Sequence, residues 1–134
     1  MEYKEGRVIT IIGCGGDRDK TKRPIMGKIA TSKSDFVIFT DDNPRTEDDR
    51  MIMKDILSGV EKDNYVVNYD RKDAIFEGVK MLEKNDILLI LGKGHEDYQI
   101  INHKKIHFSD LEIVQGLIDS FYGIERDGKK WKIN

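Results

Sequence analysis

Cysteine is nearly absent from this 134-residue chain, which contains Cys14 and no other. A single cysteine excludes a disulfide within the chain and agrees with a reducing compartment. Long apolar runs are also absent, because none approaches the ~20 residues of a membrane-spanning helix. The first ten residues, MEYKEGRVIT, are charged and lack the apolar core of a signal peptide. We therefore expect a cytoplasmic protein that does not bind a membrane.

An excess of charge of one sign is missing as well. The chain has 23 Lys and Arg against 25 Asp and Glu, a formal net charge of -2. Such a balance does not provide the basic surface with which proteins bind nucleic acid or anionic membranes, so neither is expected as a partner. The length suits one domain, and 38% hydrophobic against 36% charged residues predicts a modest core under a charged surface.

The apolar residues gather in four short runs rich in β-branched side chains, at 8–12, 36–40, 65–67 and 87–91. Each run is almost continuously apolar rather than alternating. This pattern is typical of parallel strands buried on both faces, although such short runs alone do not exclude helix.

Two segments with helical spacing lie between the first three runs. Pro24 suits the first turn of a helix over about 24–32. Thr46 is the expected N-cap of a helix over about 47–60. The apolar positions expected on one face are Ile25 and Ile29 in the first helix and Ile52, Ile56 and Val60 in the second.

Two further helices are expected later in the chain. Asp70 is the expected N-cap of one, and Ser109 and Glu112 have the spacing of a capping box before the other. Between them, residues 98–101 and 105–108 favour a β-hairpin. The apolar positions expected on one face are Ile75, Val79 and Leu82, and then Leu111, Val114, Leu117 and Phe121.

Strand and helix thus alternate up to residue 91, which predicts an α/β fold. The expected architecture is an open, mostly parallel sheet flanked by helices, with right-handed crossovers and a C-terminal β-hairpin and helix. We expect one domain over residues 1–122 and a polar tail over 123–134, which reads GIERDGKKWKIN.

Three loops follow predicted strands and contain most of the unusual residues, at 13–20, 41–45 and 92–97. If the strands are parallel, all three loops lie at the same edge of the sheet, where ligands gather in such folds. The first two each have an ordinary interpretation, a glycine turn for 13–20 and a turn with a solvated arginine for 41–45. Their coincidence at one edge favours a binding site.

Several common sites are excluded or disfavoured. A dinucleotide fingerprint would need glycine at the position of Arg18, and the P-loop pattern G-x-x-x-x-G-K-[ST] does not occur. His103 and His107 lie on the expected hairpin without an evident third ligand, so zinc is not expected. Cys14 is expected to be a small buried residue, because no nearby histidine marks it as a nucleophile.

The residues at this edge suit a zwitterionic ligand. Glycines in the first loop would let backbone N–H groups approach an anion. Arg45 projects from a turn stiffened by Pro44, and its planar fork suits bidentate binding of a carboxylate. Asp42 and Glu96 are candidate acceptors for ammonium groups.

The order and spacing of three strings resemble those of a known family. Residues 13–20 read GCGGDRDK and are followed by KRP at 22–24, residues 42–45 read DNPR, and residues 92–99 read GKGHEDYQ. Along nearly its whole length up to the last helix, the chain resembles the C-terminal domain of the Mur ligases that add the third residue of the peptidoglycan stem peptide. The tail over 123–134 adds nothing to the match.

The resemblance implies a Rossmann-like domain over 1–122 that docks on a central ATPase domain and presents the incoming amino acid. It also implies that the full ligase uses ATP and Mg²⁺ to activate the carboxylate of a UDP-MurNAc-dipeptide, which the amino group then attacks. In members that add meso-diaminopimelate, the DNPR string marks that preference. Carried over by position, the amino-acid-binding residues are Arg18, Asp42, Asn43, Pro44, Arg45, Gly92 and Glu96, with Asp17, Asp19 and Lys20 near the nucleotide.

The chain departs from the family in one respect. The N-terminal UDP-binding domain and the central P-loop ATPase domain are not in these 134 residues, so most of the ATP and Mg²⁺ site is expected outside this chain. We expect the chain alone to be inactive and assign it no catalytic residue, metal ligand or cofactor of its own. The alternative is a standalone, non-catalytic amino-acid-binding or regulatory module. A reading frame that continues upstream through a P-loop motif would favour the ligase.

Overall fold

The computed structural model describes residues 6–92, 98–101, 104–107 and 109–122. Four parallel strands form a sheet in the order β3-β2-β1-β4, namely β1 (Val8–Ile12), β2 (Phe36–Phe39), β3 (Tyr65–Val67) and β4 (Ile87–Leu91). The open parallel sheet predicted from the sequence is confirmed. Three strands have the predicted bounds, and β2 ends one residue earlier than expected.

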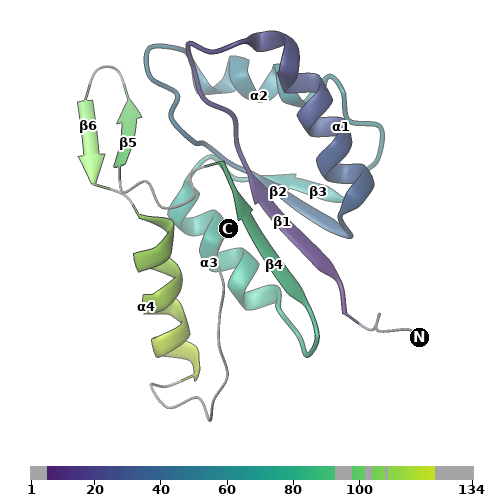
Figure 1. Ribbon diagram of the computed structural model, residues 1–134, viewed down its shortest axis with the longest axis vertical. Coiled ribbons are helices and arrows are strands. Elements are labelled where there is room, and N and C mark those ends of the chain that lie inside the picture. The colour runs from purple at the N-terminus through teal and green to yellow at the C-terminus, as the bar shows by residue number, and fades with distance from the viewer. Residues whose placement is uncertain (1–5, 93–97, 102–103, 108, 123–134) are drawn as a thin grey trace.

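Helices cover both faces of this sheet (Figure 1). The short 3-10 helix η1 (Lys20–Lys22) leads into α1 (Arg23–Lys33), which lies with α2 (Asp49–Leu57) on one face. The other face carries α3 (Arg71–Met81) and α4 (Asp110–Tyr122). The expected hairpin is present as antiparallel β5 (Tyr98–Ile101) and β6 (Lys104–His107), with β6 starting one residue early. Phe108, expected in its second strand, lies outside the described residues.

Each face of the sheet has its own apolar core, because successive strand side chains point in opposite directions. Towards α3 and α4 the buried residues are Ile11, Ile38, Ala74, Ile75, Val79, Ile90 and Val114. Towards α1 and α2 they are Ile12, Ala30, Val37, Phe39, Ile52, Met53 and Ile56. Burial on both sides explains why the sequences of the two inner strands, β1 and β2, are almost continuously apolar.

The predicted start of α2 is wrong. The helix begins at Asp49, and its N-cap is Asp48, whose side chain accepts a hydrogen bond of 2.9 Å from Arg50 N. The Thr46 hydroxyl instead donates to the Asp17 carboxylate, at 2.8 and 3.0 Å from its two oxygens. A hydroxyl that bonds another loop does not cap its own helix, so the first turn forms later in the chain.

The outward face of α1 also differs from the simple amphipathic pattern. Ile25 and Ile29 do share a face, but they are 57% and 53% exposed, whereas Gly27 and Ala30 are buried. A Cβ at Gly27 would overlap Ile56 O of α2, so the absence of a side chain lets the two helices approach closely. The other two caps are confirmed: Asp70 accepts from Asp73 N at 3.2 Å, and Ser109 Oγ from Glu112 N at 3.3 Å.

The strand order reverses direction at β1. From β1 the chain passes through α1 to β2 and then through α2 to β3, and these strands lie in that order on one side of β1 within the sheet. It then passes through α3 to β4, which pairs with the opposite edge of β1. In open α/β sheets, ligands bind beyond the carboxyl ends of the strands at this switch point. The loops that follow β1, β2 and β4 all begin at this edge.

Candidate functional site

The three predicted loops meet where β1 and β4 end. Gly92, at the end of β4, has φ of 108°, a conformation that L side chains rarely adopt. A Cβ there would lie 3.3 Å from Gly13 O and 3.7 Å from Asp42 Oδ2. The loops after β1, β2 and β4 therefore converge on Gly92, as the parallel sheet predicted. Of the third loop, residues 93–97, which include Glu96, lie outside the described residues.

The glycines of the first loop allow it to pack directly on the second. Gly16 N donates to Asn43 O at 2.6 Å, and a Cβ at Gly16 would overlap Pro44 O. Similarly, a Cβ at Gly13 would overlap Thr40 O. The expectation that these glycines leave N–H groups for an anion does not hold at Gly16, whose N–H is used within the protein. Close packing of two loops is what requires glycine here.

Arg45 folds back over this contact. Its φ is 55°, and its Nη1 donates to Gly16 O at 3.1 Å and to Asn43 O at 3.3 Å. A Cβ at Gly15 would lie 2.9 Å from Arg45 Nη1 and 3.6 Å from Arg18 Cγ, so two arginine side chains flank Gly15. The half-buried Arg45 uses only Nη1 for bonds within the described part of the chain. The remaining guanidinium donors are suited to a ligand carboxylate.

The three residues expected near the nucleotide bind other parts of the protein. Asp17 accepts hydrogen bonds from the hydroxyl and N–H of Thr46, which lower its pKa. Asp19 accepts from the hydroxyl and N–H of Thr21, which likewise lower its pKa and cap η1. Lys20 Nζ lies 3.7 Å from Glu47 Oε2 and is largely exposed. Two of the three thus stabilise the loops, and Lys20 retains access to solvent.

A buried arginine that the sequence did not single out joins the first loop to the helices. Arg23 is 1% exposed, and its two terminal nitrogens each lie 2.8 Å from a Glu47 oxygen. The same guanidinium donates to Asp55 Oδ2 at 3.0 Å and Gly15 O at 3.1 Å. In the sequence, Arg23 stands next to Pro24 and looks like an ordinary residue in the first turn of a helix. Its nearness to Glu47 arises only when α1 and α2 pack together.

A second missed pair lies on the other side of the sheet. Arg71 and Asp110 are both buried, and they form a bidentate ion pair with distances of 2.8 and 2.7 Å. Arg71 also donates to Asp41 O at 3.0 Å and to Leu91 O at 3.3 Å. Asp41 is the first residue of the second site loop, and Leu91 immediately precedes the third. No local sequence signal could have paired side chains that lie 39 residues apart.

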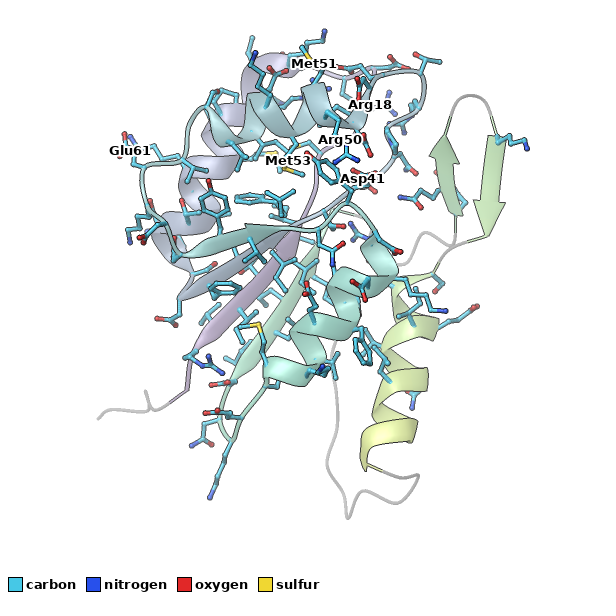
Figure 2. All side chains as sticks on the ribbon, turned by 180° about the vertical axis from the view of Figure 1, so that it is seen from behind. Arg18, Asp41, Arg50, Met51, Met53 and Glu61 are labelled. Atoms are coloured by element: carbon cyan, nitrogen blue, oxygen red, sulfur yellow. The ribbon has the colours of Figure 1, made fainter. Side chains whose placement is uncertain are left out.

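The two adjacent aspartates after β2 have different surroundings. Burial raises the pKa of Asp41, and a hydrogen bond with Asp49 and the negative charge of that neighbour raise it further, to about 8. The guanidinium of Arg50 lies 3.7 Å above the Tyr69 ring. Figure 2 shows Asp41 and Arg50 at the same edge as Arg18. Asp42 is buried, and its carbonyl accepts a 2.7 Å bond from Gln99 Nε2 of the hairpin.

Cys14 is not an activated thiol. Cys14 is half-buried rather than fully buried; its thiol donates to Met26 Sδ at 3.5 Å, and burial raises its pKa to about 11. Such a thiol is a poor nucleophile near neutral pH. Within residues 6–92, 98–101, 104–107 and 109–122, no group of three His, Cys, Asp or Glu side chains could hold a metal ion. No helix in these ranges is both long and apolar enough to span a membrane.

The structure thus gathers most of the predicted binding residues at one edge. Those in the described part of the chain are Arg18, Asp42, Asn43, Pro44, Arg45 and Gly92. Asn43 and Pro44 are buried and form the support on which Arg45 rests, while Arg18 is exposed. The arrangement places two arginines and an aspartate at the same edge, and such groups can bind the opposite charges of a small zwitterion.

Comparisons with known proteins identify the family and agree with the fold. The family described as "Mur ligase, glutamate ligase domain" matches residues 1–94. Proteins named "UDP-N-acetylmuramoyl-L-alanyl-D-glutamate--2,6-diaminopimelate ligase" are 53% identical over 117 residues in Clostridium botulinum and 56% identical over 113 residues in Rickettsia bellii. These alignments cover 87% and 84% of this chain but 24% of each relative, so the chain spans about a quarter of their length.

A solved structure of a ligase with the same name superimposes on the chain with a TM-score of 0.83 at 39% identity. It covers 87% of this chain, and the chain covers 24% of it. The fold, the matched family profile and the relatives all agree. The chain therefore belongs to the Mur ligase family, as a member of its C-terminal, glutamate ligase domains.

Proposed function

We propose that this chain is the domain that binds and positions the incoming amino acid in an ATP-dependent ligase of peptidoglycan synthesis. The ligase joins meso-diaminopimelate to UDP-MurNAc-L-Ala-D-Glu, in line with the names of the relatives. The observation that carries the proposal is the convergence of three loops on Gly92, which brings the Asp42 carboxylate beside it and places Arg18 and Arg45 around Gly15.

The charges at this edge complement those of diaminopimelate, which has two carboxylates and two ammonium groups. Arg18 and Arg45 are the candidates for its carboxylates, since an arginine fork binds a carboxylate through two parallel hydrogen bonds. Asp42 is a candidate for an ammonium group, and Glu96 is a second one on the basis of the family resemblance. Asn43 and Pro44 immediately precede Arg45, and the bonds from its Nη1 to Asn43 O and Gly16 O hold its side chain against the first loop.

One chemical group distinguishes diaminopimelate from lysine as a ligand, namely a second carboxylate. Lysine lacks the second carboxylate, so an arginine placed to bind that group would lose its partner. Leaving such a polar group without a partner costs about 1–3 kcal/mol, or roughly ten- to hundredfold in specificity. Arg45 is the proposed selector, because it is held by its Nη1 and retains other donors.

The nucleotide and its metal are proposed to be held mainly by other domains of the ligase. The described residues contain no group of three His, Cys, Asp or Glu side chains that could hold a metal ion. ATP bound there would supply the phosphoryl group that activates the acceptor carboxylate. The contribution proposed for this chain is Lys20, whose exposed ammonium group is available to a phosphate. Asp17 and Asp19 would shape the loop that carries it.

The test joins this chain to the other domains of the Clostridium botulinum relative, so that a full-length ligase is assayed. We expect the ligase to prefer meso-diaminopimelate to L-lysine in kcat/KM. Arg45→Ala is expected to reduce this preference by about ten- to hundredfold, because the lost bond is one that lysine never forms.

Lys33→Ala is the matched control, since it removes one positive charge from the last turn of α1 at the opposite end of the strands. It should leave the preference unchanged. Equal use of both amino acids by the unmodified ligase, or an Arg45→Ala variant with undiminished preference, would contradict the proposal.

A further inference from the structure

The Arg71–Asp110 ion pair is buried more deeply than its place at two helix starts requires. The side chains of both residues are 0% exposed. Arg71 Nε and Nη2 lie 2.8 and 2.7 Å from the two carboxylate oxygens of Asp110, the side-on geometry of a planar fork. Taking two charges out of water is costly, and such a pair is often no more stabilising than apolar residues of similar volume. Burial alone therefore does not explain its presence.

The preferences of helix N-termini do not explain why an arginine stands at position 71 either. It is the first residue of α3, where the helix dipole disfavours a positive charge, and Asp70 already caps that end. Asp110, as the first residue of α4, is favoured by the dipole. The acid therefore suits its own helix, whereas the arginine is held at its helix start by contacts outside α3.

Those contacts join the starts of two site loops. Arg71 Nη1 donates to Asp41 O at 3.0 Å, and Nη2 donates to Leu91 O at 3.3 Å. Asp41 follows β2 and precedes Asp42, while Leu91 ends β4 and precedes Gly92. In the sheet β2 and β4 do not pair with each other, because β1 lies between them. Arg71 links them directly across the switch point.

We propose that Arg71, held in place by Asp110, is a positioning residue for the amino-acid site, an inference that rests on the function proposed above. It contacts no substrate. Its fork fixes the separation between the loop of Asp42 and Arg45 and the turn at Gly92, and so fits the site to the length of the amino acid. Lysine offers one point charge in place of this fork and cannot reproduce both the ion pair and the two carbonyl contacts.

The test uses the full-length ligase described above and measures KM and kcat separately. Arg71→Lys and Asp110→Asn are expected to raise KM for meso-diaminopimelate by about tenfold or more, because displaced loops would lose hydrogen bonds to the bound amino acid. KM for ATP should stay nearly unchanged. A purely structural role would reduce the folded fraction, which lowers kcat without altering KM.

A matched control is available at the opposite end of the sheet. Arg7 Nη2 lies 2.7 Å from Asp86 Oδ2 and 2.8 Å from Met81 O, so it too combines an aspartate with a backbone carbonyl. Arg7→Lys should reduce stability while leaving KM for diaminopimelate at its original value. A rise in KM equal to that of Arg71→Lys would show a general effect of stability and overturn the proposal.

The double variant Arg71→Met, Asp110→Leu keeps the proposal testable if the single variants fold poorly. It leaves no unpaired buried charge, so stability should largely return. The carbonyls of Asp41 and Leu91 still lose their donor, and KM should therefore remain raised. Recovery of the original KM together with stability would overturn the positioning role. If Arg45→Ala still reduces the preference for diaminopimelate, only this inference fails; if the unmodified ligase has no such preference, the proposed function fails as well.

Discussion

At the scale of single residues, Glu47 joins three segments at the site edge: the loop after β1, the start of α1 and its own loop before α2. Its carboxylate accepts hydrogen bonds from Asp17 N at 2.8 Å and from both terminal nitrogens of Arg23. The hydrogen bonds from Arg23 are the main reason why its pKa is lowered to about 2. Since the side chain is 16% exposed and Arg23 is 1% exposed, this ion pair is largely shielded from solvent.

Glu47→Gln is expected to destabilise the chain by about 2–3 kcal/mol at neutral pH. This is less than the roughly 3–5 kcal/mol lost when a fully buried pair is broken, because Glu47 is partly exposed and Asp55 still pairs with Arg23. The folded-state pKa lies below the unfolded value, so the contribution is present above about pH 4.3 and is lost as the pH falls towards 2.

Urea unfolding between pH 2 and 7 tests this prediction. The loss of stability on acidification should be smaller in Glu47→Gln than in the unmodified chain. Glu61→Gln is the control, because Glu61 is 74% exposed and 3.9 Å from Lys28, and its effect should stay within about 0.5 kcal/mol. Parallel pH curves for the unmodified chain and Glu47→Gln would refute the role given to this carboxylate.

At the scale of elements, the contact between α1 and α2 depends on Gly27. Gly27→Ala is expected to destabilise the chain by about 1–3 kcal/mol, because the added methyl group meets the backbone carbonyl of Ile56, which cannot move without displacing α2. Helix propensity alone predicts the opposite, a gain of up to about 1 kcal/mol.

Gly116→Ala separates these two effects. Gly116 lies in α4 with nothing within 4 Å of an added Cβ, so the same substitution should stabilise the chain by about 0.5–1 kcal/mol. Thermal and urea unfolding of both variants provide the measurement. Two shifts of the same sign would mean that packing against Ile56 does not decide the effect at Gly27.

The elements themselves were largely predictable from the sequence. The runs at 8–12 and 36–40 are almost continuously apolar because both faces of β1 and β2 are covered. That pattern has few alternatives once strands and helices alternate. The start of α2 was not predictable, since Thr46 and Asp48 are both good caps. The choice between them is decided by Asp17, which approaches Thr46 only in the folded chain.

The site was predictable in its position and less so in its construction. Loops that follow parallel strands must share an edge, so the meeting of Asp42, Arg45 and Gly92 could be expected. The supports Arg23 and Arg71 could not, because their acids lie 24 and 39 residues away in the sequence. Each arginine stands at the start of a helix, where it is locally unremarkable, and its importance arises from tertiary packing alone.

At the scale of the whole molecule, the chain spans about a quarter of its relatives. We predict that the purified 134-residue chain forms no amide when given ATP, UDP-MurNAc-L-Ala-D-Glu and meso-diaminopimelate. Its sequence contains no P-loop pattern, and its described residues contain no group of three metal-binding side chains.

Release of ADP and the mass of the product measure this directly, with the full-length ligase as the positive control. The chain should be well folded in the same buffer, as judged by a cooperative unfolding transition. Product formed by the chain alone would show that it contains its own catalytic machinery and would rule out a role limited to binding.

The sheet order has a consequence for how the chain is made. β1 is an inner strand of the sheet, but one of its partners, β4, comes much later in the chain. Arg7 and Asp86, which form a hydrogen bond just before the two strands begin to pair, are 79 residues apart. While a ribosome has released only the residues up to β3, one edge of β1 stays unpaired. Open strand edges recruit strands from other chains. Release of residues 87–91 therefore lets β4 cover that edge and ends the period in which β1 itself can pair with a strand of another chain.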